Sequence, residues 1–380
     1  MKSKIVFIFI FFIYVIGHSQ IKNISTKFEL PETVSETSGL LFFNGRLLTH
    51  NDSGDGANLY ELDTISGHIS RTVNITNATN VDWEDITQDE TYIYIGDIGN
   101  NSAGNRQDLK IYRILKSDFL NNTSVTSEII SFNYEDQTDF TSKPNNTNFD
   151  AEALSVYNNK LIIFTKNWVD NTVNAYTIPK SIGHHVAIKV STYNSNGLIT
   201  GSTYNKNDDS FLLSGYTNPT GAPFLIYIKV NAISNDNIFS GAIEKTDINP
   251  TISASQIEGI TLIDKNKYFL SREKVNTVVN GTPIVLTQKL YRFDNGSFSL
   301  LNVDNSTLNS IKIFPNPAKT TLIIKGIDVK SIKIFNLNGS IIYEQKNNNA
   351  ISLKNLAQGI YLVEIRTDTG NLISKKFYKQ

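Results

Sequence analysis

The 380-residue sequence contains no cysteine, one methionine and two tryptophans, and its formal net charge is −1. The absence of cysteine excludes disulfide bonds and thiolate metal sites. The fold must therefore be stabilised by its buried core, which a large domain can supply. Helical periodicity is almost absent as well. Short runs rich in Val, Ile, Tyr, Phe and Thr alternate with turn clusters rich in Asn, Asp, Gly and Ser, which predicts an all-β protein.

The charges are distributed unevenly along the chain. Residues 311–380 contain eleven Lys and Arg against four acidic residues, a charge of +7, whereas residues 21–310 contain 22 basic and 32 acidic residues, a charge of −10. An acidic domain of this kind does not suit nucleic acid, whose phosphates require a basic face. It suits cations better, although an acidic surface also serves solubility.

The N-terminus has the features of a secretory signal peptide. Lys2 and Lys4 precede an apolar run over residues 5–16, and Gly17 and Ser19 supply small residues for cleavage after position 19. A membrane anchor is the alternative, but a run of about a dozen apolar residues is shorter than the ~20 needed to span a bilayer. We therefore expect residues 1–19 to be removed and the mature chain to contain no transmembrane helix.

A repeated unit of about four short strands occupies residues 20–304. Each unit opens with a small or acidic tetrad, and the openings fall at 36–43, 82–89, 150–157, 199–205 and 257–264. The first apolar strand positions are Leu40, Ile86, Leu154, Thr203 and Ile260, at spacings of 46, 68, 49 and 57 residues.

This period predicts the blades of a β-propeller, which typically take ~40–50 residues each. Five blades are counted, and the long gap between units two and three leaves room for a sixth. The strand at 24–30 is expected to join the last blade and close the ring. The alternative is an array of β-sandwiches, whose units would not share an opening tetrad.

The tail is a separate predicted domain. After a polar linker at 305–310, apolar alternation over 311–380 with turns at Asn338-Gly339 and Thr369-Gly370 predicts the hairpins of a small sandwich. Four motifs of this segment are characteristic of a known family: FPNP at 314–317, FNLNG at 335–339, LAQGIYLVEI at 356–365 and Lys375-Lys376-Phe377. Together they resemble the type A C-terminal sorting domain of type IX secretion cargo in Bacteroidetes.

The resemblance implies an Ig-like β-sandwich that is recognised by the type IX secretion machinery through residues 311–380. It also implies that the mature protein is secreted or held on the outer cell surface, usually after removal of this domain. An ordinary adhesion sandwich appended to the propeller is the alternative.

Acidic side chains recur where the predicted propeller would have one mouth of its channel. The start of an innermost strand and the end of the second strand lie on the same rim, so residues at these places in different blades converge. The expected ligands of a cation there are Asp52, Asp82, Glu84, Asp150, Glu152 and Glu258. Such oxygens are the ligands of a hard ion, and calcium is the expected cofactor. Hydrogen bonding of these residues to their own turns, and catalysis without a metal, remain open alternatives.

The same rim contains candidates for catalysis. His50 and Asp97 are candidate bases, and Lys166 and Arg272 could orient an anionic substrate. A Ser-His-Asp triad within residues 49–54 is disfavoured, because neighbours on one turn cannot adopt triad geometry. Trp83 and Trp168 could stack on sugars, although packing between blades is the favoured role.

A weaker resemblance covers residues 36–273 in patches. The segments THNDSG, DWEDI, GDIGNN, NFDAEAL and IEGI with SRE are similar to secreted bacterial propellers of unsettled activity, and more distantly to calcium-dependent propellers that hydrolyse phosphate esters or lactones. Unit four departs from the pattern, since residues 200–202 replace the acidic opening.

Two functions follow from the sequence. The first is a metal-assisted ester or lactone hydrolase, and the second is a non-catalytic surface module that binds a glycan, a protein or a small anionic ligand.

Overall fold

The computed structural model describes residues 21–231, 237–248, 252, 255–279, 282–295, 312–325, 328–336, 341–346, 348–367 and 372–380. The predicted signal peptide (1–19) and linker (305–310) lie outside these ranges. The chain divides into two compact units, Met1–Ser297 and Phe298–Gln380, and each is described by itself. Of the helices in the described ranges, none has the length and hydrophobicity needed to cross a bilayer.

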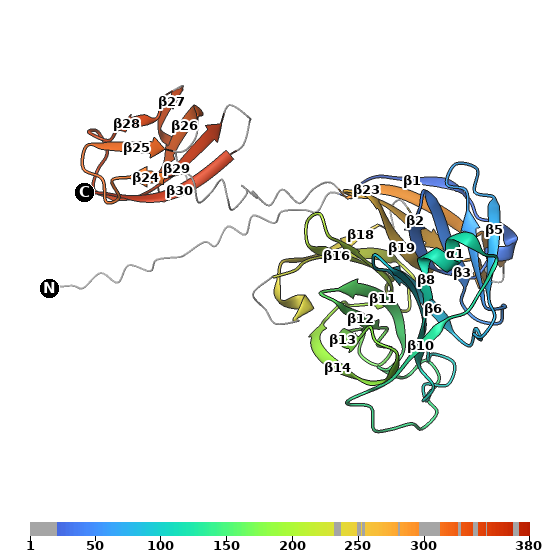
Figure 1. The fold of residues 1–380 in the computed structure, drawn as a ribbon. Coiled ribbons are helices and arrows are strands. Elements are labelled where there is room, and N and C mark those ends of the chain that lie inside the picture. The colour runs from blue at the N-terminus through green and yellow to red at the C-terminus, as the bar shows by residue number, and fades with distance from the viewer. Residues whose placement is uncertain are drawn as a thin grey trace. The chain divides into compact units, whose positions relative to one another are not determined.

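The larger unit consists of antiparallel four-stranded blades (Figure 1). Blade one contains β2 (Thr37–Phe43), β3 (Arg46–Asn51), β4 (Asn58–Leu62) and β5 (Ile69–Ile75). Blade two contains β6 (Trp83–Gln88), β7 (Tyr92–Asp97), β8 (Lys110–Leu115) and β10 (Glu128–Tyr134). Blade three contains β11 (Ala151–Tyr157), β12 (Lys160–Thr165), β13 (Val173–Pro179) and β14 (Gly183–Tyr193). Blade four contains β15 (Leu198–Asn205), β16 (Ser210–Tyr216), β17 (Pro223–Lys229) and β18 (Ile243–Asp247). Blade five contains β19 (Ile257–Asp264), β20 (Lys267–Arg272), β23 (Lys289–Asn295) and β1 (Ile21–Glu29).

The first strands of the blades form a closed ring. Each of β2, β6, β11 and β15 contacts the first strand of the next blade, and β19 contacts β2. The N-terminal strand β1 pairs antiparallel with β23, so the two ends of the domain meet in blade five, as the sequence predicted. The prediction of an all-β, propeller-type fold is confirmed.

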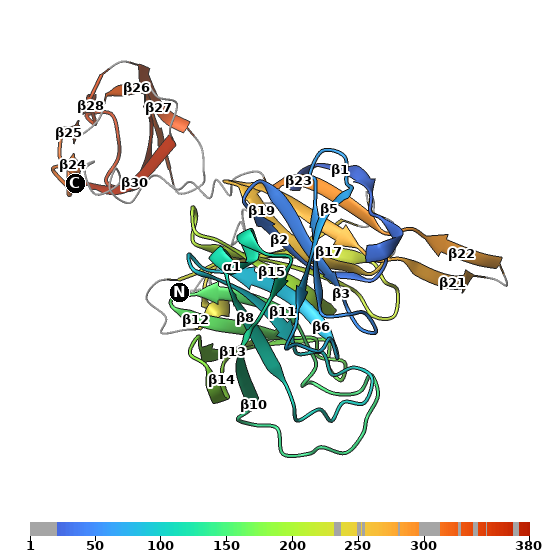
Figure 2. The ribbon, with the colours of Figure 1, turned by 45° about the vertical axis from the view of Figure 1, so that its right-hand side comes forward.

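Several smaller elements connect or extend the blades. β9 (Ser124–Val125) adds to blade one in parallel with β5, and β10 and β14 pair in parallel, so blades two and three share one eight-stranded sheet. The short helices are α1 (Lys116–Asn121), η1 (Glu32–Val34) and η2 (Ile238–Ser240). The hairpin of β21 (Val275–Val279) and β22 (Thr282–Leu286) leaves blade five after β20 and projects away from the blades (Figure 2).

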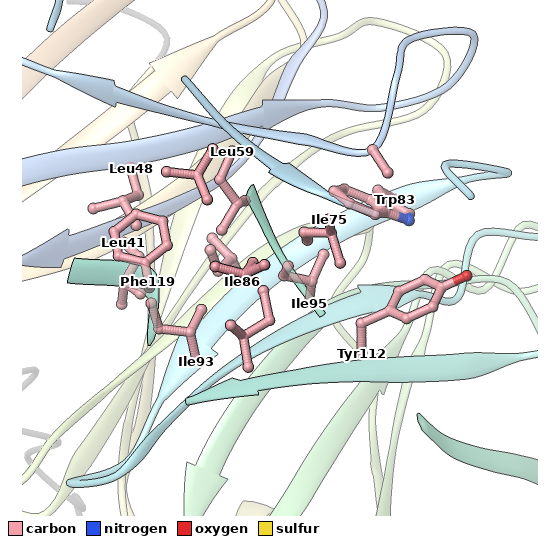
Figure 3. Close-up of a cluster of buried hydrophobic side chains, with 14 residues drawn as sticks. Leu41, Leu48, Leu59, Ile75, Trp83, Ile86, Ile93, Ile95, Tyr112 and Phe119 are labelled. Atoms are coloured by element: carbon pink, nitrogen blue, oxygen red, sulfur yellow. The ribbon is translucent and has the colours of Figure 1, made fainter. Parts of the chain in front are cut away.

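The core consists of apolar layers packed between neighbouring blades. Figure 3 shows the layer between blades one and two, in which Leu41 and Leu59 of one blade meet Ile86 and Ile95 of the other. Trp83 lies in this layer with none of its side chain exposed, and its Nε1 donates to the Thr79 carbonyl at 3.1 Å. Trp83 is therefore a packing residue between blades.

The C-terminal unit is a small sandwich of two sheets. One sheet has the order β24 (Lys312–Phe314), β25 (Thr321–Lys325), β28 (Ala350–Ser352). The other has the order β27 (Ile341–Lys346), β26 (Val329–Phe335), β29 (Gly359–Thr367), β30 (Leu372–Lys379). Alternate residues of both sheets, such as Leu322, Ile332 and Val363, form one buried core.

Candidate functional site: the carboxylate mouth of the channel

A β-bulge interrupts the first strand of every blade at the same place. In blade two, Trp83 pairs with Asp97 and Asp85 pairs with Gly96, so Glu84 is the extra residue. The equivalent irregularities contain Ser38, Glu152, Thr200 and Glu258. A bulge redirects the side chain of the extra residue, and repetition around the ring brings these side chains to one level of the channel. The structure also corrects the alignment of blade four by one residue, because the equivalent of Ile86 is Ser202 and not Thr203.

Two further levels, each made of one equivalent residue from every blade, complete this end of the channel. Two positions before each bulge stand Glu36, Asp82, Asp150, Leu198 and Gln256. The residue before each bulge pairs with a residue at the end of the second strand. The next residue along the chain after that partner is Asp52, Ile98, Lys166, Tyr216 or Glu273 in the five blades. The two levels are joined by backbone hydrogen bonds in four blades, from Asp52, Ile98, Lys166 and Glu273 to the residues at 36, 82, 150 and 256.

We call the resulting cluster the carboxylate mouth and define it by seven acidic residues: Asp52, Asp82, Glu84, Asp150, Glu152, Glu258 and Glu273. Ligand oxygens of Asp52, Asp82 and Glu84 lie within 4.8 Å of one another, and so do those of Glu84, Asp150 and Glu152. The structure thus brings together five of the six predicted metal ligands in two groups that share Glu84. Glu258 lies outside both groups, but the charge of Glu152 acts on it.

Glu84 is the centre of this cluster. Its side chain is 3% exposed, its Oε2 accepts a hydrogen bond from the Ser38 hydroxyl at 3.4 Å, and its Oε1 is buried without a hydrogen-bond partner among the described residues. Gly99 makes room for the carboxylates, since a Cβ there would lie 2.1 Å from Glu84 Oε1 and 2.5 Å from Asp82 Oδ2. The Glu84 and Asp82 carboxylates therefore pack directly against the backbone of Gly99.

Burial and mutual repulsion raise the pKa values of these acids. Burial, then the Asp82 and Glu273 charges, raises the pKa of Asp52 to about 8. Burial, then the Asp150 charge, raises the pKa of Asp82 to about 6. Burial raises the pKa of Glu273 to about 7, against the opposing charge of Lys166. Burial and the neighbouring carboxylates also raise the pKa of Glu84. Without a cation, Asp52 therefore holds a proton at neutral pH, Glu273 is about half protonated, and Asp82 takes up a proton only below about pH 6.

Lys166 is the buried cation of the mouth. Its Nζ donates to both oxygens of Glu152, at 2.5 and 2.6 Å, and lies over the rings of Trp168 and Tyr216. Burial alone would lower the pKa of Lys166, but the surrounding acidic groups, Glu152 foremost with Tyr216, Glu258 and Asp150, together outweigh it and the pKa is raised. With one lysine among seven carboxyl groups, full ionisation of the acids would leave a large excess of negative charge.

The other predicted catalytic residues have different surroundings. Asp97 is fully buried and ion-paired with Arg106 at 2.8 Å and Lys110 at 3.4 Å. His50 is fully buried against Trp83, and burial lowers its pKa to about 4. Arg272 donates to the Thr287 carbonyl at 3.1 and 2.6 Å, so its described contacts lie away from the carboxylates.

Arg106 positions the site and was not singled out from the sequence. It anchors Asp97 and the Gly99 carbonyl from a loop that no repeat pattern marks. Asp85 is one of the acidic strand starts that the repeat places at this rim. It follows the bulge of blade two, and its carboxylate accepts backbone hydrogen bonds from Ile86, Leu154 and Ser202 of three successive blades.

Comparison with known proteins identifies the tail. Residues 312–380 match the family model described as the secretion system C-terminal sorting domain. These residues are a type IX sorting domain. The protein is exported cargo of that pathway, secreted or located on the outer cell surface, as predicted.

A curated relative and several solved structures are similar to the chain at low identity. One curated protein, the ulvan lyase NLR42 of Nonlabens ulvanivorans, is 26% identical over 129 residues, which is 30% of this chain and 24% of the lyase. The chain thus spans about a quarter of the length of the curated relative that it matches.

Solved structures with similar folds include a xyloglucan-locus GH43B protein of Bacteroides ovatus and the GH32 β-fructofuranosidase BmSUC1 of Bombyx mori. The first has a TM-score of 0.42 at 9% identity and covers 92% of this chain and 90% of its own. The second has a TM-score of 0.40 at 7% identity and covers 94% of this chain and 89% of its own. Likenesses at this level carry no statement about substrate.

Proposed function

We propose that the carboxylate mouth binds a divalent cation, with Ca²⁺ as the expected ion. The observation that carries this proposal is the buried, unpartnered Oε1 of Glu84, which belongs to both groups of closely spaced carboxylates. A buried polar atom without a partner is costly, and a cation ligated by several Asp and Glu oxygens removes that cost. Lys166, the lysine buried at the mouth, is already engaged with Glu152.

We further propose that the bound ion serves hydrolysis of an ester or a lactone. An ion in this position would polarise a substrate carbonyl and stabilise the charge that develops on its oxygen. Glu273 is the fitting base, because it is partly exposed and belongs to neither group of closely spaced carboxylates. It replaces His50 and Asp97 in this role, since His50 is enclosed and Asp97 is ion-paired.

A non-catalytic binding module is the second candidate. It is favoured by the fact that two of the predicted bases, His50 and Asp97, are held in structural contacts. Trp168 is partly exposed at the mouth and donates from Nε1 to Asp150 at 2.7 Å, so it could support a sugar ring next to the ion.

Calcium titration calorimetry of the full chain after chelation tests the cation proposal. We expect Glu84→Gln to weaken calcium binding by at least about tenfold, because a charged ligand is lost. Glu29→Gln is the matched control, since Glu29 is exposed on β1 of the same domain. Absence of calcium binding by the wild-type protein, or equal binding by both variants, would refute the proposal.

Hydrolysis of a panel of lactones, carboxylic esters and phosphate esters, with and without calcium, separates the two functions. Calcium-dependent turnover that is lost in Glu84→Gln and kept in Glu29→Gln supports the hydrolase. Calcium binding without any turnover supports the binding module.

A further inference from the structure

A second hollow, of about 660 Å³, lies at the opposite end of the channel. The first strands run from the carboxylate mouth towards this end, and the later residues of all five contribute to its wall, among them Leu41, Thr87, Val156, Thr203 and Thr261. The remaining wall comes from loops that connect first and second strands, from Lys116 at the start of α1 and from Lys180 just after β13. We call it the lysine hollow, after Lys116, Lys180 and Lys206, which stand around it.

Tight packing separates the lysine hollow from the carboxylate mouth. A Cβ on Gly259 would lie 2.4 Å from the Ser38 carbonyl, and a Cβ on Gly201 would lie 2.6 Å from the Glu258 carbonyl. The first strands therefore touch backbone to backbone near the bulges. The Asp85 carboxylate also accepts hydrogen bonds from Leu154 at 2.8 Å and from Ser202 at 3.2 Å. The two ends are therefore separate sites.

The positive charge of the hollow is only partly compensated. The Asp89 carboxylate is engaged by Lys180 at 2.7 Å, by the Tyr94 hydroxyl at 2.8 Å and by two backbone amides. Lys116 lies over the Phe43 ring and donates to a backbone carbonyl. Lys206 is exposed and has no ion pair or hydrogen bond among the described residues.

Lys116 and Lys206 act on each other. The pKa of Lys116 is lowered by burial and, to a smaller extent, by the charge of Lys206, against the opposing charges of Asp89 and Glu90. Glu90 is the other acid in the wall, and it is exposed. Two ammonium groups thus repel each other across a hollow that an anion would neutralise.

The rest of the wall fits a polyhydroxylated ligand. Tyr157 and Tyr204 pack edge to face, with ring centroids 4.9 Å apart, and Gln88, Asn158 and Asn159 are amide residues of the lining. The volume lies within the roughly 300–1,000 Å³ of small-molecule sites. Aromatic faces with amides and cations around them are suited to a sugar ring with an acidic substituent.

We propose that the lysine hollow binds an anionic carbohydrate of one or two sugar residues that carries a carboxylate or a sulfate ester. Lys206 and Lys116 pair with the acidic group, and the tyrosines and amides contact the ring and its hydroxyls. The site is independent of the carboxylate mouth and needs no divalent cation.

Isothermal titration of the full chain in chelator tests this proposal. The probes are glucuronate and N-acetylglucosamine 6-sulfate, each compared with its neutral counterpart, glucose or N-acetylglucosamine. We expect at least one anionic probe to bind more tightly than its neutral counterpart, and the two arms distinguish carboxylate from sulfate recognition. The affinity should fall as ionic strength rises.

Lys206→Gln should weaken binding of that probe by about tenfold, the effect of losing a charge-assisted contact. Lys206 has no described partner, so this change leaves the fold intact, and a thermal melt checks this. Lys27→Gln, an exposed lysine on β1, is the matched control and should bind like the wild type. Equal binding of anionic and neutral probes, absence of binding, or equal affinities of the two variants would overturn the proposal.

Discussion

Lys166 donates to both oxygens of Glu152, at 2.5 and 2.6 Å, and the two side chains are 4% and 3% exposed. Lys166 follows the second strand of blade three, whereas Glu152 is the bulge residue of its first strand. The pair therefore joins two levels of the carboxylate mouth within one blade.

Removal of this lysine should leave a buried carboxylate without its partner. We expect Lys166→Met to lower the free energy of unfolding by about 3–5 kcal/mol at pH 8, since breaking a buried pair strands a charge. Urea unfolding in chelator measures this change. Lys110→Met is the control, because Asp97 keeps Arg106 as a partner, and its cost should stay below about 1 kcal/mol. A cost for Lys166→Met no larger than that of the control would contradict the central role of the pair.

Without a cation, the stability of the larger domain should fall as the pH rises. The folded-state pKa values of Asp82, Glu273 and Asp52 are raised to about 6, 7 and 8, above their values of about 4 in the unfolded chain. The native state therefore holds more protons than the unfolded state between pH 4 and 8, and the stabilisation present below pH 4 is lost towards pH 8. The slope is about 1.4 kcal/mol per pH unit for each extra proton.

Excess calcium should abolish or reverse this loss, because a bound cation favours the ionised carboxylates. Urea midpoints at pH 5, 6, 7 and 8, in chelator and in calcium, test both statements. A stability that is flat over this range in chelator, or unaffected by calcium, would speak against protonated acids at the mouth.

Gly99 should not tolerate a methyl group. In Gly99→Ala the new Cβ would meet Glu84 Oε1 and Asp82 Oδ2 well inside van der Waals contact, so the carboxylates must move apart. We expect calcium affinity to fall at least as far as in Glu84→Gln, by about tenfold or more, while the circular dichroism spectrum stays that of the wild type. Unchanged calcium affinity would show that the cation does not bind between Glu84 and Asp82.

Substitution of the two tryptophans should affect different properties of the protein, stability for Trp83 and ligand binding for Trp168. Trp83→Ala should cost about 3–5 kcal/mol of stability, because it opens a cavity between blades one and two. Trp168 is partly exposed and bonded to Asp150, so Trp168→Ala should cost less stability and instead weaken ligand binding at the mouth. Chemical unfolding and ligand titration of the two variants check the contrast, and an equal loss of stability would contradict it.

The sequence was sufficient to predict the propeller because its signal is repeated. The tetrads before Ile86, Leu154 and Ile260 share an acidic residue. The pairing of β1 with blade five was predictable because β1 precedes the first repeat unit and belongs to none of the units in sequence order. The parallel pairing of β10 with β14 carries no local pattern, since it depends on how two neighbouring blades lie at their outer edges.

The site was predicted in part for a similar reason. Glu84 and Glu152 occupy equivalent places, so their convergence followed from the repeat. The burial of His50 and the ion pair of Asp97 with Arg106 depend on packing between blades and on a loop outside the repeat, which the spacing of residues does not encode. The one-residue offset in blade four arose because the position equivalent to Ile86 is the polar Ser202 and the opening of this blade contains no acidic residue, so neither feature of the repeat marks the position.

The pairing of β1 with β23 has a consequence for biogenesis. The earliest and the latest strands of the domain share one sheet, so the ring stays open at a bare strand edge until translation has passed residue 295. An open edge invites pairing with other chains. A nascent chain therefore could not close its ring of blades, and would stay prone to aggregation, until nearly the whole domain had been synthesised.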